Sequence, residues 1–187
     1  DAVAQLMGSD LIWSGSEGNR GFDPERPVHH WHADRPGKQE LGYTRIKIML
    51  YLDSTVKDRG AIRVIPGSHR LPLHEELQPF QERHGEDTPT FFGMDGSDVP
   101  SNPVESRPGD VLFFDQSLFH AVYGKTGRRR YIALKYAARP KCKAHLASLK
   151  NWSSYTFHPH QALLDCDRPR IQEMIKDLSA LGQEAGA

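Results

Sequence analysis

The stretch from Tyr43 to Asp53 constrains the fold most, because its side chains alternate in character along its whole length. One set of alternate positions is aliphatic: Ile46, Ile48, Leu50 and Leu52. The positions between them hold a mixed set: Arg45, Lys47, Met49 and Tyr51. Such alternation is typical of a β-strand whose two faces meet different surroundings. We expect the aliphatic face to pack against a supporting layer and the mixed face to meet either solvent or the interior of a barrel that carries a site.

Short apolar runs elsewhere also predict strands, and glycine and proline separate them. The runs comprise residues 10–14, 61–65, 111–114, 118–123 and 131–138. Turns are predicted at the glycine-rich segment 15–21 and at Pro66-Gly67-Ser68-His69. Helical spacing occurs at 74–83 and, in the tail, at 143–150 and 168–181, while residues 84–107 form a long polar insertion. Many short strands with few helices predict a mainly β protein, a β-barrel or jelly roll with a few flanking helices.

The composition narrows the class of protein further. A length of 187 residues suggests one domain, and a net charge of +0 favours neither a nucleic-acid nor a membrane partner. No apolar run is long enough to span a bilayer. Two cysteines make no disulfide framework and the first residues lack the features of a signal peptide, so we expect a cytoplasmic protein. The chain starts without Met, which indicates a fragment or a trimmed form, and the oligomeric state is left open.

A cluster of metal-binding residue types lies in the segment Val28-His29-His30-Trp31-His32-Ala33-Asp34. In an extended strand, alternate side chains share a face, so His30, His32 and Asp34 are expected to project the same way, with His29 and Trp31 on the other face. A His-x-Asp pair supplies two metal ligands, and His120 on a later strand is the candidate for a third. Two histidines and one carboxylate form the facial triad that binds Fe(II) and leaves positions open for other ligands.

Two alternatives to this iron site follow from the residues alone. His32 and His120 could be ordinary, partly buried histidines, because a His-x-Asp pair by itself is a weak signal. Zinc is the second alternative, since His30 offers an extra nitrogen on the same face, although a set of His30, His32 and His120 leaves Asp34 unexplained.

The order of several motifs resembles the phytanoyl-CoA dioxygenase (PhyH) family of Fe(II)- and 2-oxoglutarate-dependent oxygenases. The matching segments are His32-Ala33-Asp34, residues 51–53, residues 59–69 with the run Val-Ile-Pro-Gly-Ser-His, residues 108–114, His120, and residues 128–136. The resemblance implies a double-stranded β-helix, a cupin-like jelly roll. It implies one oxygenase domain over 1–187, with a core at about 10–138, a C-terminal helical tail at about 143–187, and the N-terminal helices of the family missing.

The resemblance also implies the cofactors and the residues that hold them. Fe(II) is expected on His32, Asp34 and His120, with 2-oxoglutarate as cosubstrate, O2 as oxidant and ascorbate as a candidate reductant. In this family an arginine about ten residues after the distal histidine binds the 5-carboxylate of 2-oxoglutarate, and Arg130 aligns best, with Arg128 as second choice. Met49 falls where relatives line the cosubstrate pocket, and Lys47 shares its face.

The resulting hypothesis is an oxidoreductase, a dioxygenase that hydroxylates a small-molecule substrate and decarboxylates 2-oxoglutarate to succinate and CO2. Asp34 argues against a related halogenase, in which a small residue replaces the carboxylate. Two competitors remain from the residues: a zinc or manganese cupin-like hydrolase or isomerase, and a non-catalytic barrel used as a binding module. The residues 84–107 and the loop after Asp34 are expected to determine the substrate, which the sequence does not specify.

Overall fold

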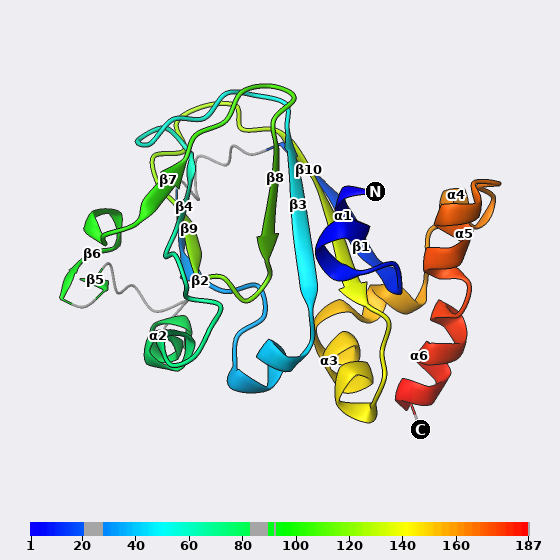
Figure 1. Cartoon of the computed structure of the whole chain (residues 1–187). Helices are drawn as coiled ribbons and strands as arrows, with labels where there is room; N and C mark the ends of the chain where they lie inside the picture. Colours follow the sequence, from blue (N-terminus) through cyan, green and yellow to red (C-terminus); the bar gives the residue numbers. More distant parts are fainter. Residues whose placement is uncertain (21–27, 83–89, 92, 187) are drawn as a thin grey trace. The chain divides into compact units, whose positions relative to one another are not determined.

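The computed structural model describes residues 1–20, 28–82, 90–91 and 93–186 (Figure 1). These residues divide into two compact units. The first, here called the helical unit, comprises residues 1–16, 43–46 and 134–187. The second, here called the strand unit, comprises residues 17–42 and 47–133 and contains all of the predicted metal ligands.

The strands form two four-stranded sheets and a small hairpin, which confirms the predicted mainly β jelly roll. The first sheet has the order β1 (Leu11–Asn19), β10 (Tyr131–Ala138), β3 (Arg45–Tyr51) and β8 (Val111–Asp115). The second has the order β2 (His29–His32), β9 (His120–Val122), β4 (Ile62–Val64) and β7 (Asn102–Val104). In the second sheet β9 pairs antiparallel with both β2 and β4.

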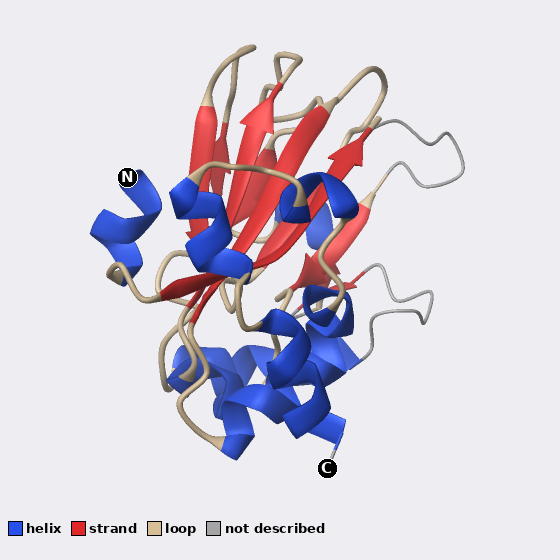
Figure 2. Cartoon of the chain, turned by 90° about the vertical axis from the view of Figure 1, so that its right-hand side faces the viewer, coloured by secondary structure: helices blue, strands red, loops and turns tan. Residues whose placement is uncertain are grey.

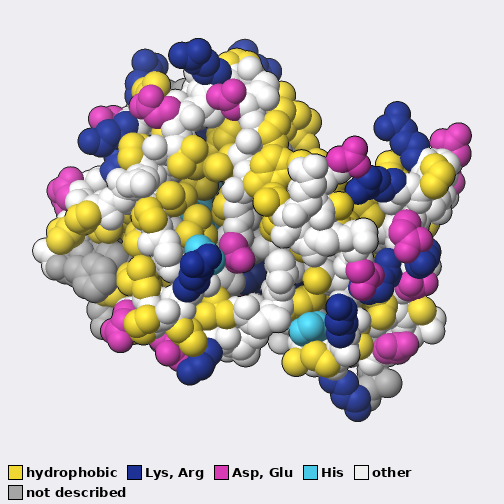
Figure 3. Space-filling model, in the orientation of Figure 1, with side chains coloured by type: hydrophobic (Ala, Val, Ile, Leu, Met, Phe, Trp, Pro, Cys, Tyr) yellow, Lys and Arg dark blue, Asp and Glu magenta, His cyan; other side chains and the backbone are white. Residues whose placement is uncertain are grey.

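Inner faces of both sheets contribute to one hydrophobic core in the strand unit. The first sheet supplies Met49, Tyr51, Phe114, Tyr131 and Ala133, and the second supplies Ile62 and Val122. On β3 the mixed face is therefore the inner one, which confirms the barrel-interior alternative for Lys47, Met49 and Tyr51. The aliphatic face is less covered than expected, because Ile46 and Leu50 are only half-buried and Leu52 is 41% exposed. Figure 3 shows hydrophobic side chains between charged ones on the visible surface.

A bulge in β2 changes the predicted facing of the histidines. His32 pairs with His120 and His29 pairs with Val122, so three steps along β2 match two along β9. The extra residue turns His29 to the face of His32, and their ring centroids lie 6.2 Å apart. The prediction that His29 lies with Trp31 on the other face was wrong for this reason. Trp31 does face away, and it packs into a second core cluster with Ala33, Leu77 and Phe119.

Helix α2 (Leu73–Glu82) and the preceding turn hold the backbone near the predicted ligands. Ser68 Oγ accepts a hydrogen bond from Phe119 N at 2.8 Å, and His74 Nδ1 donates to the Ser68 carbonyl at 3.0 Å. His74 Nε2 in turn accepts from Gly37 N at 3.1 Å. Gln81 Oε1, on the last turn of α2, accepts from Ala33 N at 2.6 Å. The turn and the helix thus fix the segments on both sides of the site.

The glycine-rich segment after residue 14 was expected to be a turn, and this was wrong for most of it, because β1 continues to Asn19. Gly15 has a φ of 133°, and a Cβ atom there would lie 2.3 Å from the Tyr155 ring. Glycine at this position therefore allows the close approach of a ring in the helical unit and does not end the strand.

The described part of residues 84–107 contains regular secondary structure. It contains the hairpin β5 (Thr90–Phe91) and β6 (Met94–Asp95), the 3-10 turn η2 (Gly96–Asp98), and β7, which pairs with β4. The predicted insertion therefore contains strands and a 3-10 turn, while 84–89 and 92 lie outside the described residues. Another 3-10 turn, η1 (Lys38–Gly42), follows Asp34.

The tail is helical as predicted, and Figure 2 shows the helices in blue. Its last predicted helix is two helices, which Figure 1 labels α5 (Pro169–Ile175) and α6 (Leu178–Gly186). The helical unit also contains α1 (Ala2–Met7), α3 (Lys143–Ser153), η3 (Ser154–Phe157) and α4 (Gln161–Leu164). Arg139 Nη2 donates to the Glu173 carbonyl at 3.0 Å, which is the acceptor that Asp177 N would need in a continuous helix. The break lets Ile175 and Leu178 both enter one core with Leu149 and Phe157.

Among the described residues, no helix is both long and apolar enough to cross a bilayer.

Candidate metal centre

His32, Asp34 and His120 form a cluster with the geometry of a metal site. His32 ends β2, Asp34 follows in a bend, and His120 begins β9 directly opposite His32. One ligand atom from each lies within 4.8 Å of the others. Asp34 Oδ1 lies 3.8 Å from His32 Nε2 and 3.9 Å from His120 Nε2. The strand pairing thus brings together residues that are far apart in the sequence.

Hydrogen bonds to the backbone orient both imidazole rings. His32 Nδ1 lies 2.7 Å from the His30 carbonyl, and His120 Nδ1 lies 2.9 Å from the Leu118 carbonyl. A carbonyl oxygen only accepts, so Nδ1 is the donor in each of these hydrogen bonds. This arrangement places the Nε2 atom of each ring on the side of Asp34 Oδ1, with Nδ1 bound to the backbone, as is usual for metal-binding histidines.

The charges in the cluster favour a carboxylate beside neutral imidazole. Burial lowers the pKa of His120 to about 3, assisted by the charges of His32 and Lys47 and opposed by Asp34. For Asp34, burial alone would raise the pKa, but Lys47, His120 and His32 together hold it well below its usual value. At neutral pH the site therefore presents an ionised Asp34 and a neutral His120, which are the ligand forms that a divalent metal binds.

The structure does not bring His30 together with His32 and His120, as the alternative zinc site would require. Of the described residues, the group that could hold a metal ion consists of His32, Asp34 and His120. The His30 ring instead makes an edge contact with Tyr123, with centroids 6.5 Å apart.

Lys47 and Met49 both face the interior from β3, and their role in lining a cosubstrate pocket stays a prediction. Met49 is 3% exposed in the inner core, and the Tyr51 hydroxyl donates to its Sδ at 3.9 Å. Lys47 Nζ donates to Asp34 Oδ2 at 2.9 Å. The structure therefore places Lys47 against a predicted metal ligand, a contact that the sequence analysis did not anticipate.

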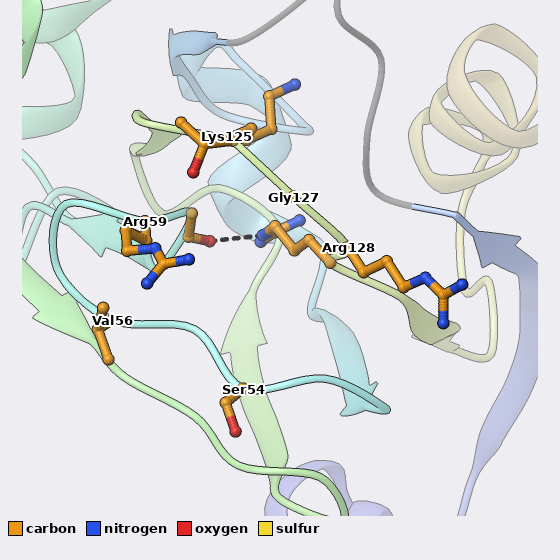
Figure 4. A pocket seen from close by; sticks show the side chains of 9 residues that line it. Ser54, Val56, Arg59, Lys125, Gly127 and Arg128 are labelled. Carbon is orange, nitrogen blue, oxygen red and sulfur yellow. Dashed lines mark hydrogen bonds between the residues drawn. The ribbon is translucent and has the colours of Figure 1, made fainter.

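The structure does not bring Arg130 or Arg128 to the cluster. Arg130 lies at the surface and forms a two-pronged ion pair with Asp53, with Nε–Oδ2 at 3.0 Å and Nη2–Oδ1 at 2.9 Å. Arg128 is exposed, and Figure 4 shows its side chain extending away from Arg59 and Lys125. Arg128 lines a cavity of about 280 Å³ between the loops at 54–60 and 125–129, together with Arg59, Lys125 and Arg129. The role of Arg130 and Arg128 in cosubstrate binding stays a prediction.

Arg129 is the arginine of this segment that points inward, and the sequence analysis passed over it. It is 4% exposed, and its guanidinium carbon lies 4.9 Å from the centre of the Tyr131 ring and 5.8 Å from that of Tyr51. Nε donates to the Gly60 carbonyl, whereas Nη2 is buried without a hydrogen-bond partner among the described residues. Tyr131 and Ala133 are buried, so strand alternation extended back to residue 129 was the signal that could have found it.

Comparison with known proteins identifies the family. The family model "Phytanoyl-CoA dioxygenase (PhyH)" matches residues 3–131, and the chain therefore belongs to this family. The dioxygenase lolE1 of Epichloe uncinata is 27% identical over 135 residues, which are 68% of this chain and 46% of lolE1. The matched part of the chain thus spans about half the length of this relative.

Solved structures support the fold. The crystal structure of EvdMO1 is similar with a TM-score of 0.54 and 24% identity, covering 73% of this chain and 29% of that protein. HygX from Streptomyces hygroscopicus, solved with nickel and 2-oxoglutarate bound, has a TM-score of 0.52 and 18% identity, covering 73% of this chain and 60% of HygX. At these identities the similarity concerns the architecture of the sheets.

Proposed function

We propose that the chain is the oxygenase domain of an Fe(II)- and 2-oxoglutarate-dependent dioxygenase that hydroxylates a small-molecule substrate. The observation that carries this proposal is the His32, Asp34 and His120 cluster, whose ligand atoms lie within 4.8 Å of one another. Membership of the phytanoyl-CoA dioxygenase family and the dioxygenase relative lolE1 support it.

The donor set fits Fe(II). Two imidazole nitrogens and one carboxylate oxygen on one side of a metal are the facial triad of non-haem iron oxygenases, and the other side stays open for further ligands. Both Nε2 atoms are prepared by their Nδ1 hydrogen bonds, and Asp34 supplies a negative charge that stabilises the ion.

Arg129 fits the distal carboxylate of 2-oxoglutarate. Its buried Nη2 lacks a partner among the described residues, and a buried guanidinium hydrogen that is left unpaired costs free energy. A ligand carboxylate bound in the barrel interior would accept a hydrogen bond from Arg129 Nη2. The planar guanidinium group binds carboxylates with a defined geometry. Met49, Tyr51 and Tyr131 give this part of the interior an apolar wall with two hydroxyl groups. We therefore propose Arg129, in preference to Arg130, as the cosubstrate ligand.

The chain's own residues then orient the reactants and exclude water. His32, Asp34 and His120 hold the metal, Arg129 holds the cosubstrate, and the buried Phe114 and Val122 limit the access of solvent from the core side. When bound, Fe(II) supplies the oxidising chemistry with O2, and 2-oxoglutarate is converted to succinate and CO2. The Asp34 carboxylate occupies the position that a halide would need, which favours hydroxylation over halogenation.

Oxygen-dependent formation of succinate tests this function. Protein loaded with Fe(II) under anaerobic conditions is mixed with 2-oxoglutarate and then exposed to air, and succinate is measured without added substrate. We expect slow succinate release that requires Fe(II) and is lost in His32→Ala and Asp34→Ala. Metal-dependent hydrolase or isomerase activity without 2-oxoglutarate consumption would contradict the proposal, as would a protein that binds no metal.

A further inference from the structure

The two carboxylate oxygens of Asp34 have different surroundings. Oδ1 is the atom that lies 3.8 Å from His32 Nε2 and 3.9 Å from His120 Nε2. Oδ2 accepts a hydrogen bond from Lys47 Nζ at 2.9 Å. Oδ1 therefore faces the two histidines of the cluster, while Oδ2 is bound by the ammonium group of Lys47.

The Lys47–Asp34 pair is an interior contact. The side chains of Lys47 and Asp34 are 11% and 18% exposed, and Lys47 Nζ lies 5.8 Å from the centre of the Phe114 ring. Lys47 comes from the middle of β3, with the buried Ile48 beside it in the sequence, so its backbone has little freedom to move. Partly buried pairs of this kind hold a fixed geometry far better than the exposed ion pairs of a protein surface.

We propose that Lys47 is a positioning residue that restricts Asp34 to one coordinating oxygen and thereby keeps a position on the metal open. This inference rests on the proposed function. A carboxylate can bind a metal through one oxygen or through both. With Asp34 bound through Oδ1 alone, the triad covers one face of the metal and leaves the opposite face open. A second Asp34 oxygen would take a position on that open face, at the expense of the chelating cosubstrate or of oxygen.

Two other roles for Lys47 make different predictions. If Lys47 instead contacts the cosubstrate directly, its loss weakens 2-oxoglutarate binding but leaves the metal site unchanged when the cosubstrate is absent. If the pair only stabilises the fold, its loss lowers the stability of the protein and changes neither the metal site nor cosubstrate affinity.

Cobalt substitution separates these roles, because the visible absorption of Co(II) reports its coordination and Co(II) does not require anaerobic handling. Wild type, Lys47→Met and Lys47→Arg are titrated with Co(II) and then with 2-oxoglutarate. Lys38→Met is the matched control, since it removes the lysine of the exposed Lys38–Glu75 ion pair in the same unit. Circular dichroism confirms that each variant is folded.

We expect Lys47→Met to bind Co(II) at least as tightly as wild type, because Asp34 gains a second free oxygen and the repelling ammonium is gone. Its cobalt spectrum should differ from that of wild type before any 2-oxoglutarate is added, and its 2-oxoglutarate affinity should fall by about tenfold or more. Lys47→Arg should restore most of the wild-type spectrum, and Lys38→Met should match wild type throughout.

A folded Lys47→Met protein with a wild-type cobalt spectrum would overturn the proposal, and so would one that binds Co(II) much more weakly. If the variant does not fold, infrared difference spectra of wild type with 13C-labelled aspartate decide the question. A wide separation of the two carboxylate stretches on metal binding indicates one coordinating oxygen, and a narrow one contradicts it. Failure of wild type to bind Co(II) or 2-oxoglutarate would count against the proposed function instead.

Discussion

At the scale of single residues, the hydrogen bonds that orient each side chain indicate what the site binds. His32 and His120 each donate a hydrogen bond from Nδ1 to a backbone carbonyl, and each Nε2 lies on the side of Asp34 Oδ1. Arg129 has its Nε committed to Gly60 and its Nη2 unpaired within the described residues. Two histidine nitrogens beside a carboxylate match a metal ion, and the unpaired guanidinium nitrogen of Arg129 matches a carboxylate ligand.

The proposed roles of Arg129 and Arg130 are separated by substituting each with alanine. Arg129→Ala should weaken 2-oxoglutarate binding by about 3 kcal/mol, roughly a hundredfold, because a buried charged pair is lost. Arg130→Ala should leave the affinity near that of wild type, since its guanidinium is exposed and paired with Asp53. Isothermal titration of the metal-loaded proteins with 2-oxoglutarate measures both. The reverse order of effects would restore the original prediction of Arg130.

The difference between these arginines shows where reasoning from sequence ends. The ligand candidates could be predicted, because a His-x-Asp pair and a distant histidine fall in a recognisable order of motifs. The order of motifs does not distinguish Arg128, Arg129 and Arg130, because they are adjacent. Only alternation counted back from Tyr131 separates them, and a shift of one residue reverses the facing of a strand. The contact between Lys47 and Asp34 depends on how β3 meets the loop after β2, and no local pattern carries that information.

At the scale of elements, the Pro-Gly-Ser-His turn and α2 hold the backbone segments that carry the proposed metal ligands. Ser68 is fully buried, and its hydroxyl and carbonyl bind the strand that carries His120 and the helix that carries His74. Gln81 on the same helix binds the backbone of Ala33, between His32 and Asp34. These bonds explain in physical terms why the most specific motif of the sequence lies near the site and yet supplies no metal ligand.

Ser68→Ala tests this role of the turn. The substitution leaves the buried Phe119 N–H without its acceptor and should lower the free energy of unfolding by about 1–3 kcal/mol. Because His120 follows Phe119 directly, Fe(II) affinity should also fall by several-fold. Urea unfolding and anaerobic Fe(II) titration measure the two effects. Ser101→Ala is the control, since within the described part of the chain the Ser101 hydroxyl donates to the Val99 carbonyl of its own loop. A loss of metal affinity in both variants would contradict a specific role for Ser68.

At the scale of the whole molecule, we propose that residues 1–187 act as a single oxygenase domain although the chain divides into two compact units. Strands β1, β3 and β10 each contribute residues to both units, so neither unit has a complete set of strands of its own. The sequence pattern predicted the helical tail but not the break between α5 and α6, where the Glu173 carbonyl accepts a hydrogen bond from the distant Arg139.

Leu178→Ala tests whether the units unfold together. Leu178 is fully buried in the core of the helical unit, so its truncation should cost about 2–5 kcal/mol. With shared strands we expect one cooperative transition, shifted as a whole, when unfolding is followed both by tryptophan fluorescence and by circular dichroism. The exposed Leu164→Ala serves as control and should have little effect. Two separate transitions, with only one shifted, would contradict the single-domain proposal.

The central claim is that His32, Asp34 and His120 hold Fe(II) with 2-oxoglutarate chelated to its open face. Its most direct test is the visible charge-transfer absorption that develops when Fe(II) and 2-oxoglutarate are added together to the protein without oxygen. We predict a band in wild type that requires both additions and is absent in His32→Ala and His120→Ala. The absence of a band in wild type, or a band that survives either substitution, would contradict the account.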